Sequence, residues 1–171
     1  MSDQKRHALI TGASRGIGAA IAIDLAKDGH QISVNYNSHQ DDANEIVKQI
    51  ESIGGEARAV KGNVSDSKSV NEMVKKATDN FGNIEILVNN AGIISDNLLL
   101  RMKEDEFDKV IDTNLKGTFY CSKACVPSMV KNRWGRIINI TSVVGIRGNI
   151  GQTNYSASKG AIHSFTFSLA K

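Results

Sequence analysis

The chain has 171 residues, with 21 Lys and Arg against 18 Asp and Glu, so its formal net charge at pH 7 is only +3. This length suits one domain with a sizeable buried core, and so weak and scattered a charge argues against a nucleic-acid-binding protein. No apolar run approaches the ~20 residues of a membrane span, and no hydrophobic signal core follows the amino terminus, so we expect a cytoplasmic protein.

The first predicted elements are a short buried strand near 6–11 and a helix near 16–28, joined by a glycine-rich loop over residues 11–18. The loop has the spacing Gly12-x-x-x-Gly16-x-Gly18. A glycine-rich turn alone is often only a turn. Between a strand and a helix, however, it lets the backbone approach a pyrophosphate, which the free N–H groups and dipole of the helix then bind.

Strands and helices alternate along the rest of the chain. The sequence predicts strands near 31–36, 56–61, 84–89 and 135–141, and helices near 40–53, 67–81, 103–131 and 153–170. Repeated strand–helix–strand units indicate an α/β protein of the Rossmann type, with a doubly wound parallel sheet and helices on both faces. We expect residues 1–171 to form a single dinucleotide-binding and catalytic domain.

The long helix predicted over 103–131 is expected to be broken near residue 113. Pro127 lies inside it and should kink it or mark a local break. Cys121 and Cys125 lie four residues apart on it. No histidine cluster accompanies them, so we expect them to pack as small apolar groups, and we predict neither a metal site nor a disulfide framework.

Amide side chains occur at two places that favour ligand binding. Asn89 and Asn90 end the strand predicted near 84–89, and Asn114 opens a long helical stretch. Amides at a strand end can bind backbone groups or a ribose. Each also has a simpler interpretation, as turn chemistry for the first two and as a helix cap for Asn114.

Tyr155 and Lys159 lie four residues apart on the last predicted helix, so they share one face. A free tyrosine titrates near ~10, and a nearby cation lowers such a pKa by ~1–3 units. This would allow a phenol to exchange protons near neutral pH, as acid–base work on a carbonyl or alcohol requires. Ser142 lies thirteen residues upstream of Tyr155. Such a Tyr–Lys pair also occurs by chance on solvated helices, and Ser142 could simply cap a turn.

The chain ends at Lys171, inside the helix that carries Tyr155 and Lys159. The strand predicted near 135–141 would then be an open apolar edge of the sheet, which is an association hazard.

Taken together, these motifs resemble the short-chain dehydrogenase/reductase family. The resemblance runs through five ordered stretches: the glycine loop, Asn89-Asn90-Ala91-Gly92, Asn114, Ser142 and Tyr155-x-x-x-Lys159. Within that family, the stretches over 96–102, 110–117, 142–145 and 151–155 look like the bacterial 3-oxoacyl-[acyl-carrier-protein] reductases.

The resemblance implies a catalytic set of Asn114, Ser142, Tyr155 and Lys159. Tyr155 would give a proton to the developing alkoxide, and Lys159 would depress the pKa of that tyrosine and bind the nicotinamide ribose. Ser142 would hydrogen-bond the substrate carbonyl, and Asn114 would hold a water that links Lys159 to solvent. The implied substrate-binding residues are Ser142, Gln152 and Tyr155.

The resemblance also implies a nicotinamide dinucleotide. Besides Tyr155 and Lys159, its binding residues would be Gly12, Ser14, Arg15, Gly16, Ile17, Gly18, Asn63, Val64, Asn90, Ala91 and Gly92. An acid ~20 residues beyond the glycine loop usually marks preference for the unphosphorylated cofactor. The second strand has no acid before Asp41, and Arg15 offers a cation, so we predict NADP(H).

The implied reaction is reduction of a 3-oxoacyl thioester on acyl carrier protein, within fatty-acid synthesis and lipid metabolism. A basic cluster of Lys131, Arg133 and Arg136 would suit an acidic carrier, although an ordinary solvated loop can have the same charges. Two alternatives stay open: a sibling enzyme acting on acetoacetyl-coenzyme A, a sugar or a polyol, and a non-catalytic cofactor-binding fragment. The resemblance further implies a homotetramer, and the weak charge and the lack of a long apolar run make neither nucleic acid nor membrane an expected partner. Chains of this family continue beyond the helix of Tyr155 and Lys159 with further strands, so the resemblance implies that the domain is incomplete at its carboxyl end and lacks its last strands.

Overall fold

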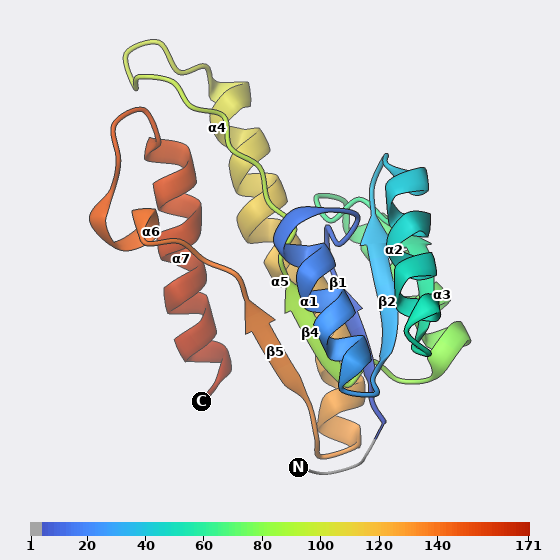
Figure 1. Cartoon of the computed structure of the whole chain (residues 1–171). Helices are drawn as coiled ribbons and strands as arrows, with labels where there is room; N and C mark the ends of the chain where they lie inside the picture. Colours follow the sequence, from blue (N-terminus) through green and yellow to red (C-terminus); the bar gives the residue numbers. More distant parts are fainter. Residues whose placement is uncertain (1–4) are drawn as a thin grey trace.

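A five-stranded parallel sheet forms the centre of the molecule, in a computed structural model that describes residues 5–171 (Figure 1). The strand order is β3-β2-β1-β4-β5, and every neighbouring pair is parallel. The strands are β1 His7–Ile10, β2 Gln31–Tyr36, β3 Glu56–Lys61, β4 Ile86–Asn89 and β5 Arg136–Asn139. Successive strands are added in one direction from β1 to β3 and in the other direction from β4 to β5. Such sheets bind ligands where this direction changes, here between β1 and β4, at the carboxyl ends of the strands.

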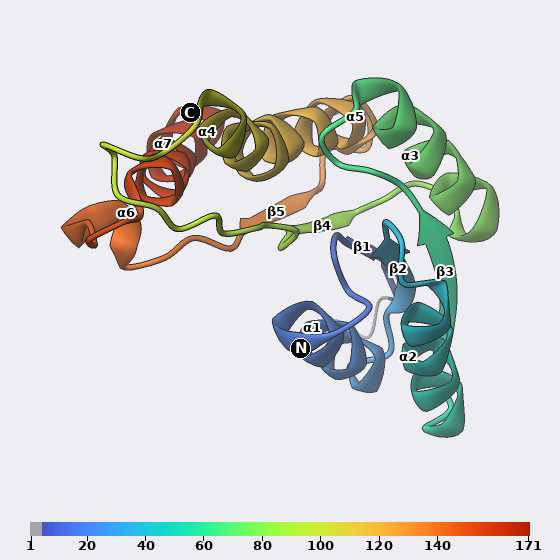
Figure 2. The ribbon, with the colours of Figure 1, turned by 90° about the horizontal axis from the view of Figure 1, so that it is seen from above.

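Helices cover both faces of the sheet (Figure 2). One face carries α1 Gly16–Lys27 and α2 Gln40–Ser52. The other carries α3 Ser67–Phe81, α4 Glu104–Val110, the π-helix η1 Ile111–Lys116, α5 Gly117–Lys131 and α7 Thr153–Leu169. The predicted doubly wound α/β fold is confirmed. Apart from the long helix predicted over 103–131, the ends of the predicted helices and strands agree with the structure to within two residues.

Two hydrophobic cores lie on the two sides of the sheet, because successive strand residues point to opposite faces. Ala8 and Ile10 of β1 join the core beneath α1 and α2, whereas Leu9 joins the core beneath α3 and α5. Cys121 and Cys125 belong to this second core, which confirms that they pack as small apolar groups. Burial raises the pKa of the Cys121 thiol to about 12.

The long helix differs from its prediction in the form of its break. The chain stays helical through residue 113, but residues 111–116 form a π-helix between α4 and α5. Asn114 therefore lies inside a helical segment and not at a helix start, so its interpretation as a cap is wrong. The helix α5 also continues through Pro127, so no break occurs there. A four-residue helix, α6 Val144–Arg147, was not predicted.

The strand β5 lies at one edge of the sheet, as predicted. Its residues are alternately exposed and half-buried, and Ile138 is 46 % exposed. Its register partner on β4, Val88, is fully buried. None of the helices within residues 5–171 combines the length and apolarity needed to cross a bilayer.

Candidate active site

The glycine loop after β1 has a conformation that other residues adopt poorly. Gly12 and Gly16 have φ angles of 62° and 60°, in the left-handed region that glycine tolerates. A Cβ atom on Gly12 would lie 3.0 Å from the Cα atom of Ala91, and one on Gly18 would lie 2.5 Å from Nδ2 of Asn90. Gly12 and Gly18 are therefore required for close packing against the segment that follows β4.

Asn90 holds the glycine loop in place. Its Nδ2 donates to the carbonyl oxygens of Thr11, at 2.9 Å, and Gly12, at 3.2 Å. The backbone N–H groups of Asn90 and Ala91 each donate to Oγ1 of Thr11 at 3.0 Å. Asn89 instead links β4 to its neighbours, donating to Ser122 and Asn139. The two amides at the end of β4 thus have separate roles.

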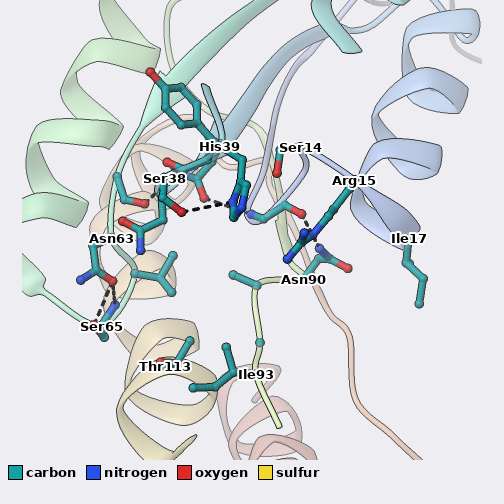
Figure 3. A pocket seen from close by; sticks show the side chains of 18 of the residues that line it. Ser14, Arg15, Ile17, Ser38, His39, Asn63, Ser65, Asn90, Ile93 and Thr113 are labelled. Atoms are coloured by element: carbon teal, nitrogen blue, oxygen red, sulfur yellow. Dashed lines mark hydrogen bonds between the residues drawn. The ribbon is translucent and has the colours of Figure 1, made fainter. Parts of the chain in front are cut away.

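A groove of about 560 Å³ opens at the carboxyl edge of the sheet, beside this loop (Figure 3). Ser14 and Arg15 lie on one side of it, and Ser38, His39 and Asn63 lie on the other. Of the predicted cofactor residues, those that line it are Gly12, Ser14, Arg15, Ile17, Asn63, Val64, Asn90, Ala91 and Gly92. Gly16 and Gly18 lie outside the lining; Gly18 acts through packing.

The groove suits an anionic dinucleotide. Arg15 and Lys109 line it, and no Asp or Glu is among its lining residues within the described chain. The amino end of α1 faces it at Arg15, where no side chain caps the free N–H groups, so that end can receive a phosphate. The residues present therefore fit a phosphorylated dinucleotide.

Sequence reasoning missed the lining residues that follow β2, namely Asn37, Ser38 and His39. Oγ of Ser38 lies 3.1 Å from Nδ1 of His39. Their position directly beyond a predicted parallel strand was a usable signal, because the carboxyl ends of these strands meet at one edge. Polar residues in a loop are common, however, and carry no motif of their own.

Tyr155 and Lys159 line a smaller cavity of about 180 Å³. This cavity shares Ile17, Asn90, Gly92 and Ile93 with the groove, so the two spaces adjoin. The Nζ atom of Lys159 lies 5.7 Å from the ring centroid of Tyr155. The structure thus brings the predicted phenol and amine to the end of the dinucleotide groove.

Lys159 is nearly buried, at 5 % exposure, and its Nζ donates to the carbonyl oxygen of Ile140 at 2.8 Å. Burial removes water from the ammonium group and lowers the pKa of Lys159 below its ordinary value of 10.5. The Ile140 contact holds the amine beside the end of β5. Thr141, which was not predicted, lines the same cavity and donates to the carbonyl oxygen of Lys159 at 3.1 Å.

Asn114 braces the segments around this cavity from within the π-helix. It is fully buried, and its side chain accepts from the N–H of Ile93 at 2.8 Å and donates to the carbonyl oxygen of Ile93 at 3.0 Å. Its Nδ2 also lies within 3.0 Å of Oγ of Ser158, which in turn donates to the carbonyl oxygen of Tyr155. Asn114 therefore ties the segment after β4 to the helix that carries Tyr155.

Ser142 and Gln152 are not among the described residues that line this cavity. Oγ of Ser142 accepts from the N–H of Val144 at 3.2 Å, in the turn that leads into α6. Nε2 of Gln152 donates to both carboxylate oxygens of Asp96 at 3.0 Å, which ties the start of α7 to the loop after β4. The structure therefore engages both predicted substrate residues in contacts within the chain.

The chain is similar to known enzymes over nearly its whole length. A family model described as short chain dehydrogenase matches residues 6–171. The chain is 49 % identical over 166 residues to a 3-oxoacyl-[acyl-carrier-protein] reductase FabG of Staphylococcus epidermidis, and 48 % identical over 166 residues to that of Staphylococcus aureus. It is 51 % identical over 164 residues to a 3-oxoacyl-[acyl-carrier-protein] reductase of Synechocystis.

These alignments cover 97 % of the chain for the two staphylococcal proteins and 96 % for the Synechocystis protein. They span 68 % of each staphylococcal relative and 66 % of the Synechocystis relative. The match includes the glycine loop, the amides after β4 and the Tyr155–Lys159 pair. The chain belongs to the short-chain dehydrogenase/reductase family, as an oxidoreductase that acts on CH–OH and C=O groups with NADP(H) as its cofactor.

Proposed function

We propose that this protein reduces a 3-oxoacyl thioester, carried by acyl carrier protein, to the 3-hydroxyacyl thioester in fatty-acid biosynthesis. The observation that carries the proposal is the Tyr155–Lys159 pair at the end of a cation-lined groove. The names of its relatives supply the substrate class. We further propose that residues 1–171 act as one dinucleotide-binding and catalytic domain, in the cytoplasm.

When bound, NADPH supplies the hydride that reduces the carbonyl carbon. The chain's own residues then manage the proton and the charge. Tyr155 gives its hydroxyl proton to the carbonyl oxygen, so that hydride and proton together convert C=O to CH–OH. The Lys159 ammonium beside the ring stabilises the phenolate that remains and favours this transfer.

Ser142 is proposed to stabilise charge on the substrate oxygen. Its Oγ accepts from the Val144 N–H and so keeps its own proton available to donate. A hydroxyl aimed at the site of developing negative charge lowers the barrier because it is already oriented. Asn114 is proposed to keep Tyr155 and Lys159 aligned through Ser158, and to hold the water that returns a proton to them.

The groove residues are proposed to hold NADP(H) along the carboxyl edge of the sheet. The glycine loop and the amino end of α1 would bind the pyrophosphate, with Asn63 and Val64 beside the adenine. Arg15 would attract the ribose phosphate, and no carboxylate among the described lining residues opposes it. Gln152 is proposed as a substrate contact that Asp96 positions.

The carrier protein is proposed to dock near the carboxyl end of α5. Lys131, Arg133 and Arg136 lie there, and Arg136 stacks over the ring of Trp134 with its guanidinium carbon 4.9 Å from the ring centroid. A basic surface favours an acidic carrier chiefly by raising the association rate. We also propose a homotetramer, by analogy with the family.

Substrate comparison tests this proposal. NADPH oxidation should be followed with acetoacetyl groups on acyl carrier protein and on coenzyme A, and with a sugar ketone, at equal concentrations. We expect the highest kcat/KM with the carrier-bound substrate. Higher kcat/KM with coenzyme A or the sugar would favour the sibling-enzyme alternative. NADPH binding without turnover of any of them would favour a non-catalytic role.

A further inference from the structure

We propose that Asn35 is a positioning residue for the cofactor, because its side chain joins the glycine loop to the segment after β3 and so preforms the parts of the groove proposed for the pyrophosphate and the adenine. This inference rests on the assignment of that groove to NADP(H). Asn35 was not among the residues singled out from the sequence.

The contacts of Asn35 run in two directions. Its Oδ1 accepts from the N–H of Gly12 at 3.0 Å, which fixes the first glycine of the loop. Its Nδ2 donates to the carbonyl oxygen of Gly62 at 3.0 Å, with the Val60 carbonyl at 3.3 Å. Its backbone carbonyl also accepts from the N–H of Ala13 at 2.9 Å. One residue thus connects β1, β2 and β3 at their carboxyl ends.

Burial explains why an amide is needed here. Asn35 is 2 % exposed and follows the apolar residues Ile32 and Val34 in β2, a strand whose interior disfavours asparagine. A buried carboxamide costs stability unless its donor and acceptor are both satisfied. Here the acceptor serves one loop and the donor serves another, so no apolar residue of this size can replace both contacts.

The two anchored segments lie at the places where the cofactor would bind. Gly12 belongs to the loop proposed for the pyrophosphate, and Gly62 precedes Asn63, the residue proposed beside the adenine. All three, with Asn35 itself, line the groove. Holding these segments in position before binding reduces the ordering cost that the ligand must otherwise meet. Asn35 therefore acts on cofactor affinity and not on the chemical step.

Two substitutions test this role in the same protein. Asn35→Asp keeps an acceptor for the Gly12 N–H but places a carboxylate against the carbonyl oxygens of Val60 and Gly62. Asn35→Ser removes both contacts without adding charge. We expect each to raise the Kd for NADPH, measured by cofactor fluorescence without substrate, by about tenfold or more. The kcat at saturating NADPH and the KM for the keto substrate should stay within about twofold of wild type.

Acidification separates positioning from general damage. A protonated carboxyl has one O–H donor besides its acceptor oxygen, so it can restore the Gly12 and Gly62 contacts although the second N–H of the amide is lost. Burial among carbonyl oxygens raises the pKa of an introduced carboxyl. The ratio of the Asn35→Asp Kd to the wild-type Kd should fall towards one as pH decreases, whereas the Asn35→Ser ratio should not. Asn37→Asp, at an exposed lining position, controls for added charge at the groove.

Three outcomes would overturn the inference: an unchanged NADPH Kd in Asn35→Ser, a loss of kcat equal to the loss of affinity, or an Asn35→Asp ratio that does not recover at low pH beyond that of Asn37→Asp. Thermal unfolding of the cofactor-free variants confirms that they are folded before the comparison. Failure of the proposed function is distinguishable, because it would appear as weak NADPH binding or no turnover by the wild type.

Discussion

The two strands β4 and β5 are neighbours in one sheet, yet their surroundings differ sharply. All four residues of β4 are buried, whereas β5 alternates between exposed and half-buried positions. The glycine loop and its two amide anchors are built on the fully packed strands, and Lys159 is held through the carbonyl oxygen of Ile140, just beyond β5. Local unfolding costs less free energy where fewer apolar contacts are lost. We therefore expect the proposed catalytic side, formed by β5 and α7, to unfold locally more readily than the cofactor side, formed by the glycine loop and the strands that hold it.

Exposed apolar side chains mark the same division. Near the catalytic cavity, large apolar residues are exposed in the loop after β4 and between β5 and α7: Ile94, Leu98, Leu99, Leu100, Val143, Ile146 and Ile150. Hydrogen bonds between Asn97 and Gly151, and between Asp96 and Gln152, join these two loops. The proposed cofactor groove and the proposed catalytic residues thus lie in a more fully packed part and a more exposed part of the molecule, which separate measurements can address.

The largest expected effect isolates the catalytic side. Tyr155→Phe removes the proposed proton donor but keeps the ring, so kcat should fall by about 100- to 10,000-fold. The Kd for NADPH should change little, because the groove loses no lining residue. Tyr120→Phe, on α5, is the matched control and should keep near-normal turnover. Comparable turnover by the two variants would remove Tyr155 from the mechanism.

The next effect compares the two parts through one type of substitution. Ile10→Ala, at a fully buried position of β1, should reduce the free energy of unfolding by about 2–5 kcal/mol. Ile138→Ala, at a position of β5 that is 46 % exposed, should cost about 1 kcal/mol, because less apolar surface is lost from contact. Urea unfolding measures both. Equal costs would show that the packing difference has no energetic consequence.

A smaller effect concerns the cofactor side alone. A Cβ atom on Gly18 would lie 2.8 Å from the carbonyl oxygen of Gly12 as well as close to Asn90. Gly18→Ala should therefore shift the loop, weaken NADPH binding and cost about 1–3 kcal/mol of stability. Gly29→Ala, where φ is 86° and the added atom meets open space, is the control for backbone strain alone. NADPH affinity equal in the two variants would contradict the close-packing role.

The smallest effect is a pH dependence of stability at the amino end of the central strand β1, away from the groove. His7 is buried, with its ring nitrogens 2.9 Å from the Gly82 carbonyl oxygen and 2.8 Å from Oγ of Ser33. Burial lowers the pKa of His7 below its ordinary value of 6.5. The unfolded chain therefore takes up a proton first as pH falls, so this stability contribution is complete above pH 6.5 and is lost below it.

The free energy of unfolding should be measured between about pH 8 and about pH 5, because this range brackets the ordinary pKa of histidine. The wild type should lose stability as the pH falls through this range. The dependence should be weaker in His7→Gln and unchanged in His39→Gln, which alters an exposed histidine. A wild-type slope that survives in His7→Gln would assign it to other groups.

Most of the fold was predictable because its signals are periodic. The strands β1 and β4 contain short apolar runs, and α3 shows a clear stripe in Val70, Met73 and Ala77. The π-helix was not predictable, because a helical turn whose hydrogen bond spans one additional residue does not change the polarity pattern of a mixed sequence in a recognisable way. The helix α6 is too short to display a period.

The candidate site could be predicted from the sequence where its residues form compact motifs, and could not where it depends on long-range contacts. The glycine loop, Asn90, Tyr155 and Lys159 belong to compact motifs. Asn35 lies 23 residues from Gly12 and 27 from Gly62, so its role emerges only when three strands are aligned. The engagement of Gln152 by Asp96 likewise depends on the meeting of two distant loops.

The π-helix has a consequence for how this chain can vary. Residues 104–131 form one uninterrupted helical rod that packs against α7 at one end and against α3 at the other. Each α-helical residue advances the phase of a rod by about 100°. The π-helical turn absorbs one additional residue, so deleting one residue from 111–116 and restoring regular winding should leave the two ends of the rod in nearly their present relative orientation. A deletion in α5 before Cys121, where no such turn absorbs it, should instead rotate Cys121 and Cys125 out of the core. Length changes in the regular parts of this rod should therefore be less tolerated than a one-residue deletion within 111–116.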